Sequence, residues 1–174
     1  MKPHPVCAAW LCVAAQGLPA AAQVPCAQAS VAALVQQVNH VRAQGADCGA
    51  RGRFAPAAAL GWHPALESVA RAQAQWLADY GLLLHTGSQG QTLGQRASAA
   101  GYRYARVTEN LAKGQSDVAA ALRAWTASEG HCVNLYDAGV NEMALACAPG
   151  ADGRALWVLV MGRLLPPAAP APAQ

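Results

Sequence analysis

Two histidines of this chain lie in short polar segments that each follow an apolar, helix-like stretch. His85 opens one such segment, and His131 follows Ser128-Glu129-Gly130 in the other. Glu109 lies between them in the sequence, and Glu129 is two residues before His131. Two imidazoles with one or two carboxylates can hold a divalent cation such as zinc, with water completing its coordination. The same groups can act as an acid–base pair, in which a carboxylate orients one imidazole while the other transfers a proton.

Spacing alone favours a simpler interpretation, in which these four side chains are polar residues that bridge loops. No compact His-x-x-x-His pair is present, and the four residues are scattered over the sequence. Ser128 is close to His131, but no G-x-S-x-G turn surrounds it, so the sequence predicts no serine nucleophile. Any chemistry therefore depends on the fold that brings these residues together.

The length and composition of the chain indicate a single globular domain. The chain has 174 residues, of which 54% are hydrophobic and 12% charged, too apolar for a disordered chain. Its abundant alanine favours helices. The formal net charge is +3, and Lys2 and Lys113 are the only lysines. Such sparse positive charge predicts no nucleic-acid partner, because phosphate neutralisation needs clustered Lys and Arg.

The first 22 residues have the layout of a secretory signal peptide. Lys2 precedes a short apolar run over 6–13, and Ala20-Ala21-Ala22 provides a small-residue cleavage site. No other segment reaches 18 uninterrupted apolar residues, so we expect no transmembrane segment in the mature chain. We therefore predict an exported protein, periplasmic or extracellular, with one domain over 23–164 and a disordered Pro/Ala-rich tail over 165–174.

Removal of the signal peptide leaves four cysteines: Cys26, Cys48, Cys132 and Cys147. In an exported chain four cysteines indicate two disulfides, with three possible pairings. We favour Cys26–Cys48 and Cys132–Cys147, because each pair brackets one compact segment. A zinc cluster would need closely spaced cysteine pairs, which the sequence lacks.

Apolar periodicity predicts four helices and a few short strands. The helices are expected from Val31 to near Gly45, and over 64–84, 92–100 and 116–129, with Ser30 and Ser116 as N-caps. Apolar runs over 143–147 and 156–161 flank a turn and predict a hairpin, and 102–108 is a third candidate strand. The segment between Cys48 and Gly61 is expected to be a loop, and the tryptophans to be core residues. The fold class is α+β, with helices packed on a small antiparallel sheet.

The order of several short motifs resembles the CAP superfamily (cysteine-rich secretory proteins, antigen 5 and pathogenesis-related 1) in its bacterial form. The resemblance extends over roughly residues 29–162 and includes motifs typical of the family. These motifs are Val38-Asn39-His40-Val41-Arg42, Leu60-Gly61-Trp62-His63-Pro64-Ala65-Leu66, His85-Thr86-Gly87-Ser88, Gly94-Gln95-Arg96, Ala100-Gly101-Tyr102, Glu109-Asn110-Leu111-Ala112-Lys113-Gly114 and the stretch 125–135.

This resemblance implies an α-β-α sandwich with a central antiparallel sheet and a cleft lined by a His/Glu tetrad. His85 matches the first histidine of the tetrad and Glu109 the glutamate of the E-N-[LI]-A motif. Glu129 and His131 fall in the bacterial S-x-G-H segment and match the other two members. In some relatives the cleft binds zinc or another divalent ion, and in others a neighbouring apolar groove binds sterols or fatty acids.

Three functions are compatible with these residues. The first is an exported binding module that captures a small amphipathic or lipid-like ligand, a divalent metal, or both. The second is a metal-assisted hydrolase, in which His85 and His131 hold the cation while Glu109 or Glu129 acts as the base. The third is a structural domain in which the cluster holds loops together. A catalytic zinc usually has three protein ligands, so the sequence favours the binding module over the enzyme.

Overall fold

The computed structural model describes Cys26 and residues 29–167. The predicted signal peptide and residues 168–174 of the predicted tail lie outside this range. In chain order the elements are α1 (Val31–Arg42), β1 (Ala46–Asp47), the 3₁₀ helix η1 (Gly49–Arg51), β2 (Arg53–Phe54), β3 (Gly61–Trp62), α2 (Pro64–Tyr80), α3 (Leu93–Ala99), β4 (Tyr104–Lys113), α4 (Val118–Thr126), α5 (Glu129–Leu135), β5 (Glu142–Pro149) and β6 (Ala155–Leu164).

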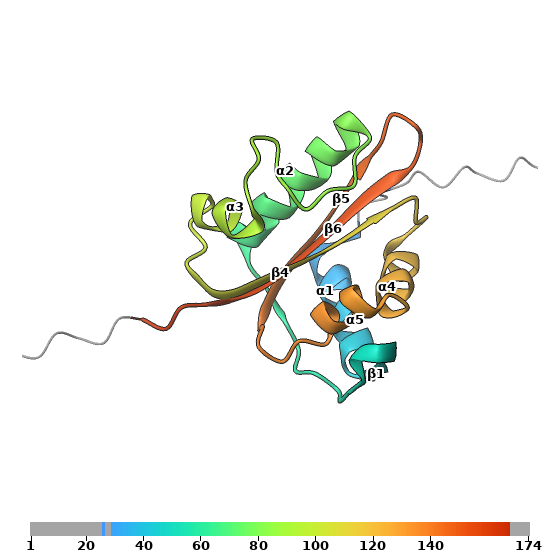
Figure 1. Ribbon diagram of the computed structural model, residues 1–174, viewed down its shortest axis with the longest axis vertical. Coiled ribbons are helices and arrows are strands. Elements are labelled where there is room, and N and C mark those ends of the chain that lie inside the picture. Colours follow the sequence, from blue (N-terminus) through green and yellow to red (C-terminus); the bar gives the residue numbers. More distant parts are fainter. Residues whose placement is uncertain (1–25, 27–28, 168–174) are drawn as a thin grey trace, which may run out of the picture.

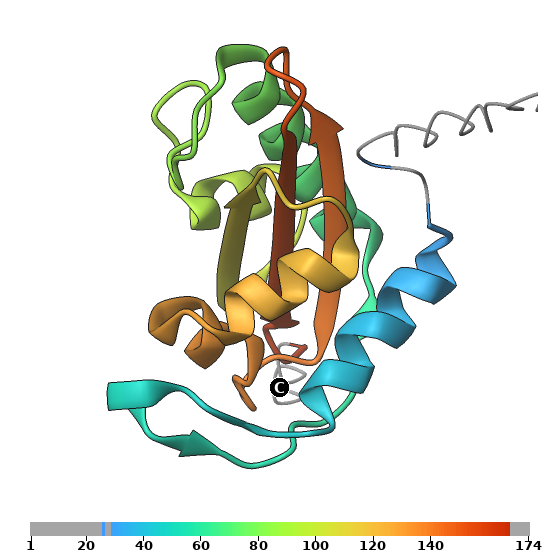
Figure 2. The same cartoon turned by 90° about the vertical axis from the view of Figure 1, so that its right-hand side faces the viewer.

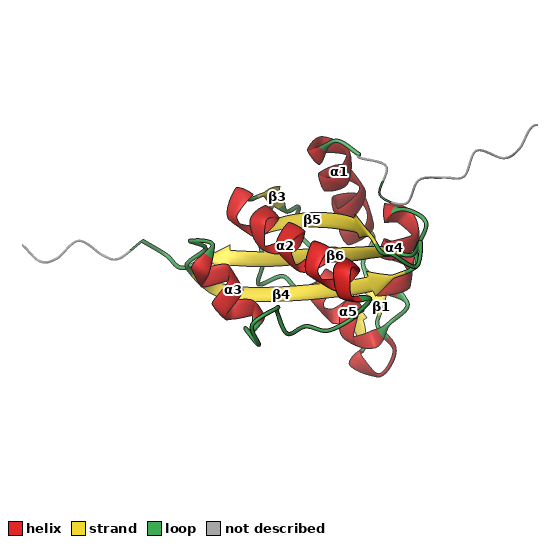
Figure 3. Ribbon diagram, turned by 90° about the horizontal axis from the view of Figure 1, so that it is seen from above, coloured by secondary structure: helices red, strands yellow, loops and turns green. Residues whose placement is uncertain are grey.

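A four-stranded sheet in the order β3-β5-β6-β4 forms the centre of the molecule (Figure 3). The predicted hairpin is confirmed as β5 and β6, which pair antiparallel from Glu142 opposite Gly162 to Pro149 opposite Ala155. The third candidate strand becomes β4, which begins two residues later than expected and continues to Lys113 along the outer edge of β6. The short β3 pairs parallel with β5, so the sheet is antiparallel except at this edge.

Helices cover both faces of the sheet, which confirms the expected α-β-α sandwich (Figures 1 and 2). The side chains of α2 and α3 pack with alternate sheet residues such as Leu111 and Val158 into one apolar cluster. The side chains of α1, α4 and α5 pack with the intervening residues, such as Ala112 and Leu159, into a second cluster. Successive residues of a strand face opposite sides, so each long strand contributes to both cores.

The caps of the helices show which helix ends the local sequence predicts. Ser30 caps α1 as predicted, since its side chain accepts a hydrogen bond from the backbone N–H of Ala33. Thr92 caps α3 in a reciprocal capping box with Gln95. The second helix ends at Tyr80 rather than near Leu84, because Gly81 adopts a left-handed conformation with φ of 65°. No helix among the described residues is long and apolar enough to cross a membrane.

The predicted fourth helix is instead two helices. Asp117, and not Ser116, caps α4 through a hydrogen bond from the N–H of Ala120. The chain then bends at Ser128, which has extended backbone angles, and continues as α5 through Gly130. Glycine opposes helix formation locally, but Cys132 and Leu135 of α5 are completely buried, so tertiary packing outweighs this preference.

The predicted disulfide pairing is wrong. The structure joins Cys26 to Cys147 and Cys48 to Cys132, over sequence separations of 121 and 84 residues. The expected loop between Cys48 and Gly61 contains η1 and the short strand β2, which pairs antiparallel with β1 just before Cys48. This segment packs beside α5, and it therefore presents Cys48 to Cys132 across the fold. Proximity in sequence was a poor guide because neither predicted pair bracketed an independently folding segment.

Arg42, at the end of α1, joins three segments through one buried guanidinium. The residue has no exposed surface, and its nitrogens donate hydrogen bonds to the carbonyl oxygens of Ala58, Leu135 and Asp137. Backbone carbonyls that end a helix or lie in a loop need donors when they are buried. The Arg42 side chain therefore provides hydrogen-bond donors for the carbonyl oxygens at the end of α5 and for one in the loop before β3.

Loss of the Cys48–Cys132 bond should destabilise the domain. We expect the Cys48→Ala/Cys132→Ala double variant to lower the free energy of unfolding by about 2–5 kcal/mol, because the cross-link restricts the unfolded chain. Urea unfolding of the variant and the parent measures this difference. Peptide mapping without reductant is the control for the pairing, and a peptide that joins Cys26 to Cys48 would contradict the structure.

Candidate functional site

A buried carboxylate and an exposed imidazole form the centre of the candidate site. Glu109 projects from β4 toward the layer of α2 and α3, and His85 lies in the connection between these helices. The Nδ1 atom of His85 is 2.9 Å from Oε1 of Glu109. The Glu109 side chain is only 2% exposed, whereas that of His85 is 62% exposed. The structure thus brings together two of the four predicted site residues, His85 and Glu109, with the histidine on the solvent side.

Arg96 of α3 is the third member of this site, and the sequence analysis did not assign it a role. Its Nη2 donates to Oε2 of Glu109 at 3.0 Å and to the carbonyl of His85 at 2.9 Å. Gly87 allows this approach, because a Cβ at that position would lie 2.8 Å from Cδ of Arg96. A signal was available, since Gly94-Gln95-Arg96 and His85-Thr86-Gly87-Ser88 are both motifs of the resemblance. Both oxygens of Glu109 are thus occupied by cationic or hydrogen-bonding partners.

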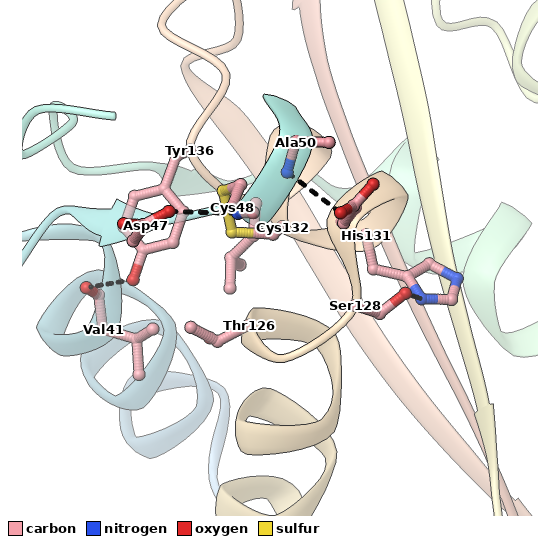
Figure 4. The surroundings of a disulfide bond; sticks show 12 residues. Val41, Asp47, Cys48, Ala50, Thr126, Ser128, His131, Cys132 and Tyr136 are labelled. Carbon is pink, nitrogen blue, oxygen red and sulfur yellow. Dashed lines mark hydrogen bonds between the residues drawn. A yellow bond between two sulfur atoms is a disulfide. The ribbon is translucent and has the colours of Figure 1, made fainter. Parts of the chain in front are cut away.

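His131 approaches β4 from the other helical layer. It lies in the first turn of α5, and its Nδ1 is 3.0 Å from Oγ of Ser128 (Figure 4). Burial lowers the pKa of His131 from its ordinary value, and the nearby charge of His85 lowers it further. Both effects disfavour the protonated form of the His131 ring.

Glu129 does not join the other three predicted residues. Its Oε1 accepts a hydrogen bond from the backbone N–H of Ala50 in η1, at 2.9 Å. Gly49 lies against the same carboxylate, since a Cβ there would be 2.6 Å from Oε1. Residues two apart on a helix point in nearly opposite directions, so Glu129 and His131 of α5 cannot face one cleft. The expected tetrad is therefore not assembled.

Asn110 connects the site to α5 from within the core. It is completely buried, its Nδ2 donates to the carbonyl of His131 at 2.9 Å, and its Oδ1 accepts from Nδ2 of Asn134 at 3.0 Å. Asn134 also donates to the carbonyl of Glu109. These bonds hold the first turn of α5, which carries His131, against residues 109 and 110 of the edge strand.

The donor set does not fit a resident catalytic zinc ion. No group of three or more His, Cys, Asp or Glu side chains suited to a metal occurs in the described part of the chain. The Nδ1 atoms of His85 and His131 contact Glu109 and Ser128, which leaves the two Nε2 atoms for a cation. Two imidazoles are fewer than the three protein ligands of a catalytic zinc site. The predicted role of His85 and His131 as metal ligands therefore depends on these two nitrogens alone.

A separate groove of about 680 Å³ is lined by residues of α1 and α4 and of the segments that follow them. Figure 2 shows these two helices on the same side of the sheet. Its apolar floor includes Val41, Leu122 and Tyr136, and Leu122 and Tyr136 are buried. The Tyr136 hydroxyl donates to the carbonyl of Val41, so this polar atom is satisfied. The remaining lining residues are mostly polar or small: Gln36, Gln37, His40, Gln44, Gly45, Ala46, Asp47, Ala119, Arg123, Thr126 and Ala127.

The Glu109–Arg96 ion pair should contribute far more to stability than an exposed pair. Replacing Arg96 with methionine would leave the buried carboxylate without its cation, and we expect a loss of about 3–5 kcal/mol in urea unfolding. Arg71→Met is the matched control, because Arg71 pairs with Glu67 on the exposed surface of α2 and should cost less than about 1 kcal/mol. Equal losses in the two variants would contradict the assigned role of Arg96.

The lowered pKa of His131 predicts how the stability of the folded protein depends on pH. The folded protein binds a proton at His131 less tightly than the unfolded chain, whose histidine titrates near 6.5. The stabilisation from the neutral ring is therefore complete above pH 6.5 and is lost as the pH falls through the folded pKa. In NMR titrations we expect His131 to titrate below 6.5 and its pKa to rise in His85→Gln. A His131 pKa that is unchanged in this variant would exclude an electrostatic contribution from His85.

The fold is found in several solved structures of bacterial proteins. An extracellular protein with an SCP domain from Bacillus anthracis matches with a TM-score of 0.55 and 25% identity, over 62% of this chain and 34% of that protein. An outer surface protein from Borrelia burgdorferi matches with a TM-score of 0.58 and 23% identity, over 63% and 80% of the two chains. A cysteine-rich secretory protein from Staphylococcus aureus matches with a TM-score of 0.53 and 16% identity, over 76% and 38%.

This chain thus spans only about a third of the Bacillus and Staphylococcus proteins that it matches. No curated protein matches its sequence significantly. The model of the cysteine-rich secretory protein (CAP) family matches residues 35–161, which is well over half of the chain and contains every residue of the candidate site. The chain therefore belongs to the cysteine-rich secretory protein family.

Proposed function

We propose that this protein is an exported, non-catalytic binding module that captures a small amphipathic or lipid-like molecule in the groove between α1 and α4. The observation that carries the proposal is the division of the groove into an apolar floor and a polar rim. Val41, Leu122 and Tyr136 provide the floor, where an alkyl chain would lose its contact with water. A volume of about 680 Å³ is within the usual range for sites that bind small organic molecules.

Arg123 gives the rim a specific preference for an acidic head group. It is exposed on α4, lines the groove, and makes no ion pair within the described residues. His40 and Gln44, one turn apart on the facing side, share a hydrogen bond of 2.9 Å. A carboxylate at the rim would therefore meet the guanidinium of Arg123 and the hydrogen-bonding groups of His40 and Gln44, while Asp47, the acidic residue of the lining, is paired with Arg53 at 3.4 Å. This arrangement favours a fatty-acid-like ligand over a neutral lipid.

The His85–Glu109–Arg96 cluster has a different role in this proposal, and the metal-assisted hydrolase is the weaker alternative. A hydrolytic base needs a carboxylate oxygen that is free to accept a proton from water. Both oxygens of Glu109 already have partners, and Glu129 is bound to Ala50 on the far side of α5. The cluster is better suited to holding the α2–α3 connection against β4 than to turning over a substrate.

Export is part of the proposal and is supported by the two disulfides. Disulfides persist in oxidising compartments such as the periplasm and the cell exterior. The matching Bacillus anthracis protein is described as extracellular. A soluble carrier in either compartment would meet amphipathic molecules released from membranes.

Binding of dodecanoate, measured by isothermal titration calorimetry, tests the groove. We expect Arg123→Gln to weaken dodecanoate binding about tenfold or more, because a charge-assisted hydrogen bond is lost, and to leave dodecanol binding unchanged. Ala119→Trp should block both ligands, since this exposed residue lines the groove. Ala32→Trp is the matched control on an exposed position of α1 outside the groove. Dodecanoate binding that survives Ala119→Trp, or no binding to the parent protein, would overturn the proposal.

A further inference from the structure

A second, smaller pocket lies on the opposite face of the molecule, where α2, α3 and the loop between them meet. Its volume is about 250 Å³, which is below the usual range for sites of drug-sized ligands. The pocket therefore admits only one small ring. Its lining contains one aromatic side chain together with polar and small apolar ones: Ser68, Val69, Ala72, Gln73, Trp76, Ser88, Gln91, Gln95, Arg96, Ala99 and Ala100.

Aromatic side chains extend this pocket along the outer surface of α2. Trp76 was expected in the core, but it is only half-buried and forms part of the pocket wall. Tyr80, one helical turn further, is 69% exposed, and its ring centroid is 6.1 Å from that of Trp76 with a tilt of 46°. Residues four apart on a helix are neighbours on its surface. The two rings thus form a continuous aromatic surface that leads out of the pocket.

A hydrogen-bond acceptor and a hydrogen-bond donor lie beside the aromatic wall of the pocket. Gln73 is buried, and its Nε2 donates to the carbonyls of Leu84 and Thr86, so its orientation is fixed and its Oε1 keeps no partner among the described residues. The Oε1 of Gln95 accepts from Thr92 in the capping box, which leaves the Nε2 of Gln95 as a donor. The pocket therefore offers a fixed acceptor and a fixed donor beside an indole ring.

We propose that this pocket binds one ring of a neutral oligosaccharide, and that the next ring stacks on Tyr80. A pyranose ring has an apolar face of C–H groups, which packs on an aromatic face, and hydroxyl groups that both donate and accept hydrogen bonds. Arg96 is the only charged residue in the lining, and its charge is balanced by Glu109. Its Nε and Nη1 atoms are buried and have no hydrogen-bond partner among the described residues, so they are available as donors. A neutral sugar can use its hydroxyl oxygens as acceptors for these donors without bringing a second anion next to the Glu109 carboxylate.

This site is independent of the groove between α1 and α4, since the two lie on opposite faces of the sheet and share no lining residue. The probes are three neutral trisaccharides, cellotriose, maltotriose and tri-N-acetylchitotriose, together with the corresponding monosaccharides. Binding is measured by chemical-shift perturbation of the backbone amide N–H groups of the residues that line the pocket, at millimolar sugar concentration, so that the same signals can be followed in the parent and in every variant. We expect at least one trisaccharide to bind, and Trp76→Ala to weaken it about tenfold or more.

Further variants separate the parts of the site. Tyr80→Ala should weaken binding of the trisaccharide and leave binding of the monosaccharide unchanged. Ala72→Trp, on an exposed position of the lining, should block the pocket without removing a core side chain. Gln75→Ala is the control beside Trp76, because Gln75 is exposed and bonds only to Asp79 among the described residues. Arg123→Gln should not affect sugar binding, which distinguishes this site from the lipid groove.

Two results would overturn the proposal. One is the absence of binding by all three trisaccharides to the parent protein. The other is trisaccharide binding that is retained in Ala72→Trp and in a folded Trp76→Ala variant, as judged by thermal unfolding.

Discussion

The charge of Glu109 is the constraint on which the rest of the site depends. A carboxylate that is almost fully removed from water is stable only if cations and donors replace its hydration. Arg96 supplies the cation, and His85 supplies a hydrogen-bonding ring at the solvent boundary. These partners come from α3 and from the α2–α3 connection, so the folding of one edge strand determines where both segments lie. Glycine is needed at position 87 for the same reason, since a side chain there would push Arg96 away from the Glu109 carboxylate.

The strand that carries Glu109 is also held from its other face. The buried Asn110 bonds to the partly buried Asn134, and the indole Nε1 of Trp125 donates to the carbonyl of Leu111 at 2.9 Å. An edge strand exposes backbone groups that would otherwise recruit further strands. Here Asn134 of α5 and Trp125 of α4 donate hydrogen bonds to the carbonyl oxygens of Glu109 and Leu111, so these backbone groups are already paired. The short Glu-Asn-Leu segment thus links both helical layers, which explains why polar residues occur in the middle of an apolar sheet.

Patterns that act over one or two helical turns predicted much of this fold. The N-cap Ser30, the helix that follows Thr92 and the hairpin of β5 and β6 could all be inferred from residue types, and the family resemblance pointed to His85 and Glu109 as members of one site. Features that depend on contacts between residues far apart in the sequence could not be inferred in this way. The disulfide partners depend on where η1 and α5 pack, and Glu129 was misplaced because the bend at Ser128 that begins α5 has no strong sequence signal. Trp76 was assigned to the core because periodicity identifies the inward side of a helix but not the depth of each residue.

The hydrogen bonds of Arg42 have a consequence for how the molecule resists damage. One guanidinium holds the end of α1, the loop that precedes β3 and the last turn of α5. These segments are distant in sequence, and none can open alone without leaving buried carbonyls unsatisfied. Local fluctuations in this half of the protein must therefore be collective and rare. An exported protein exposed to proteases would gain durability from such coupling, because cleavage generally requires a segment to detach first.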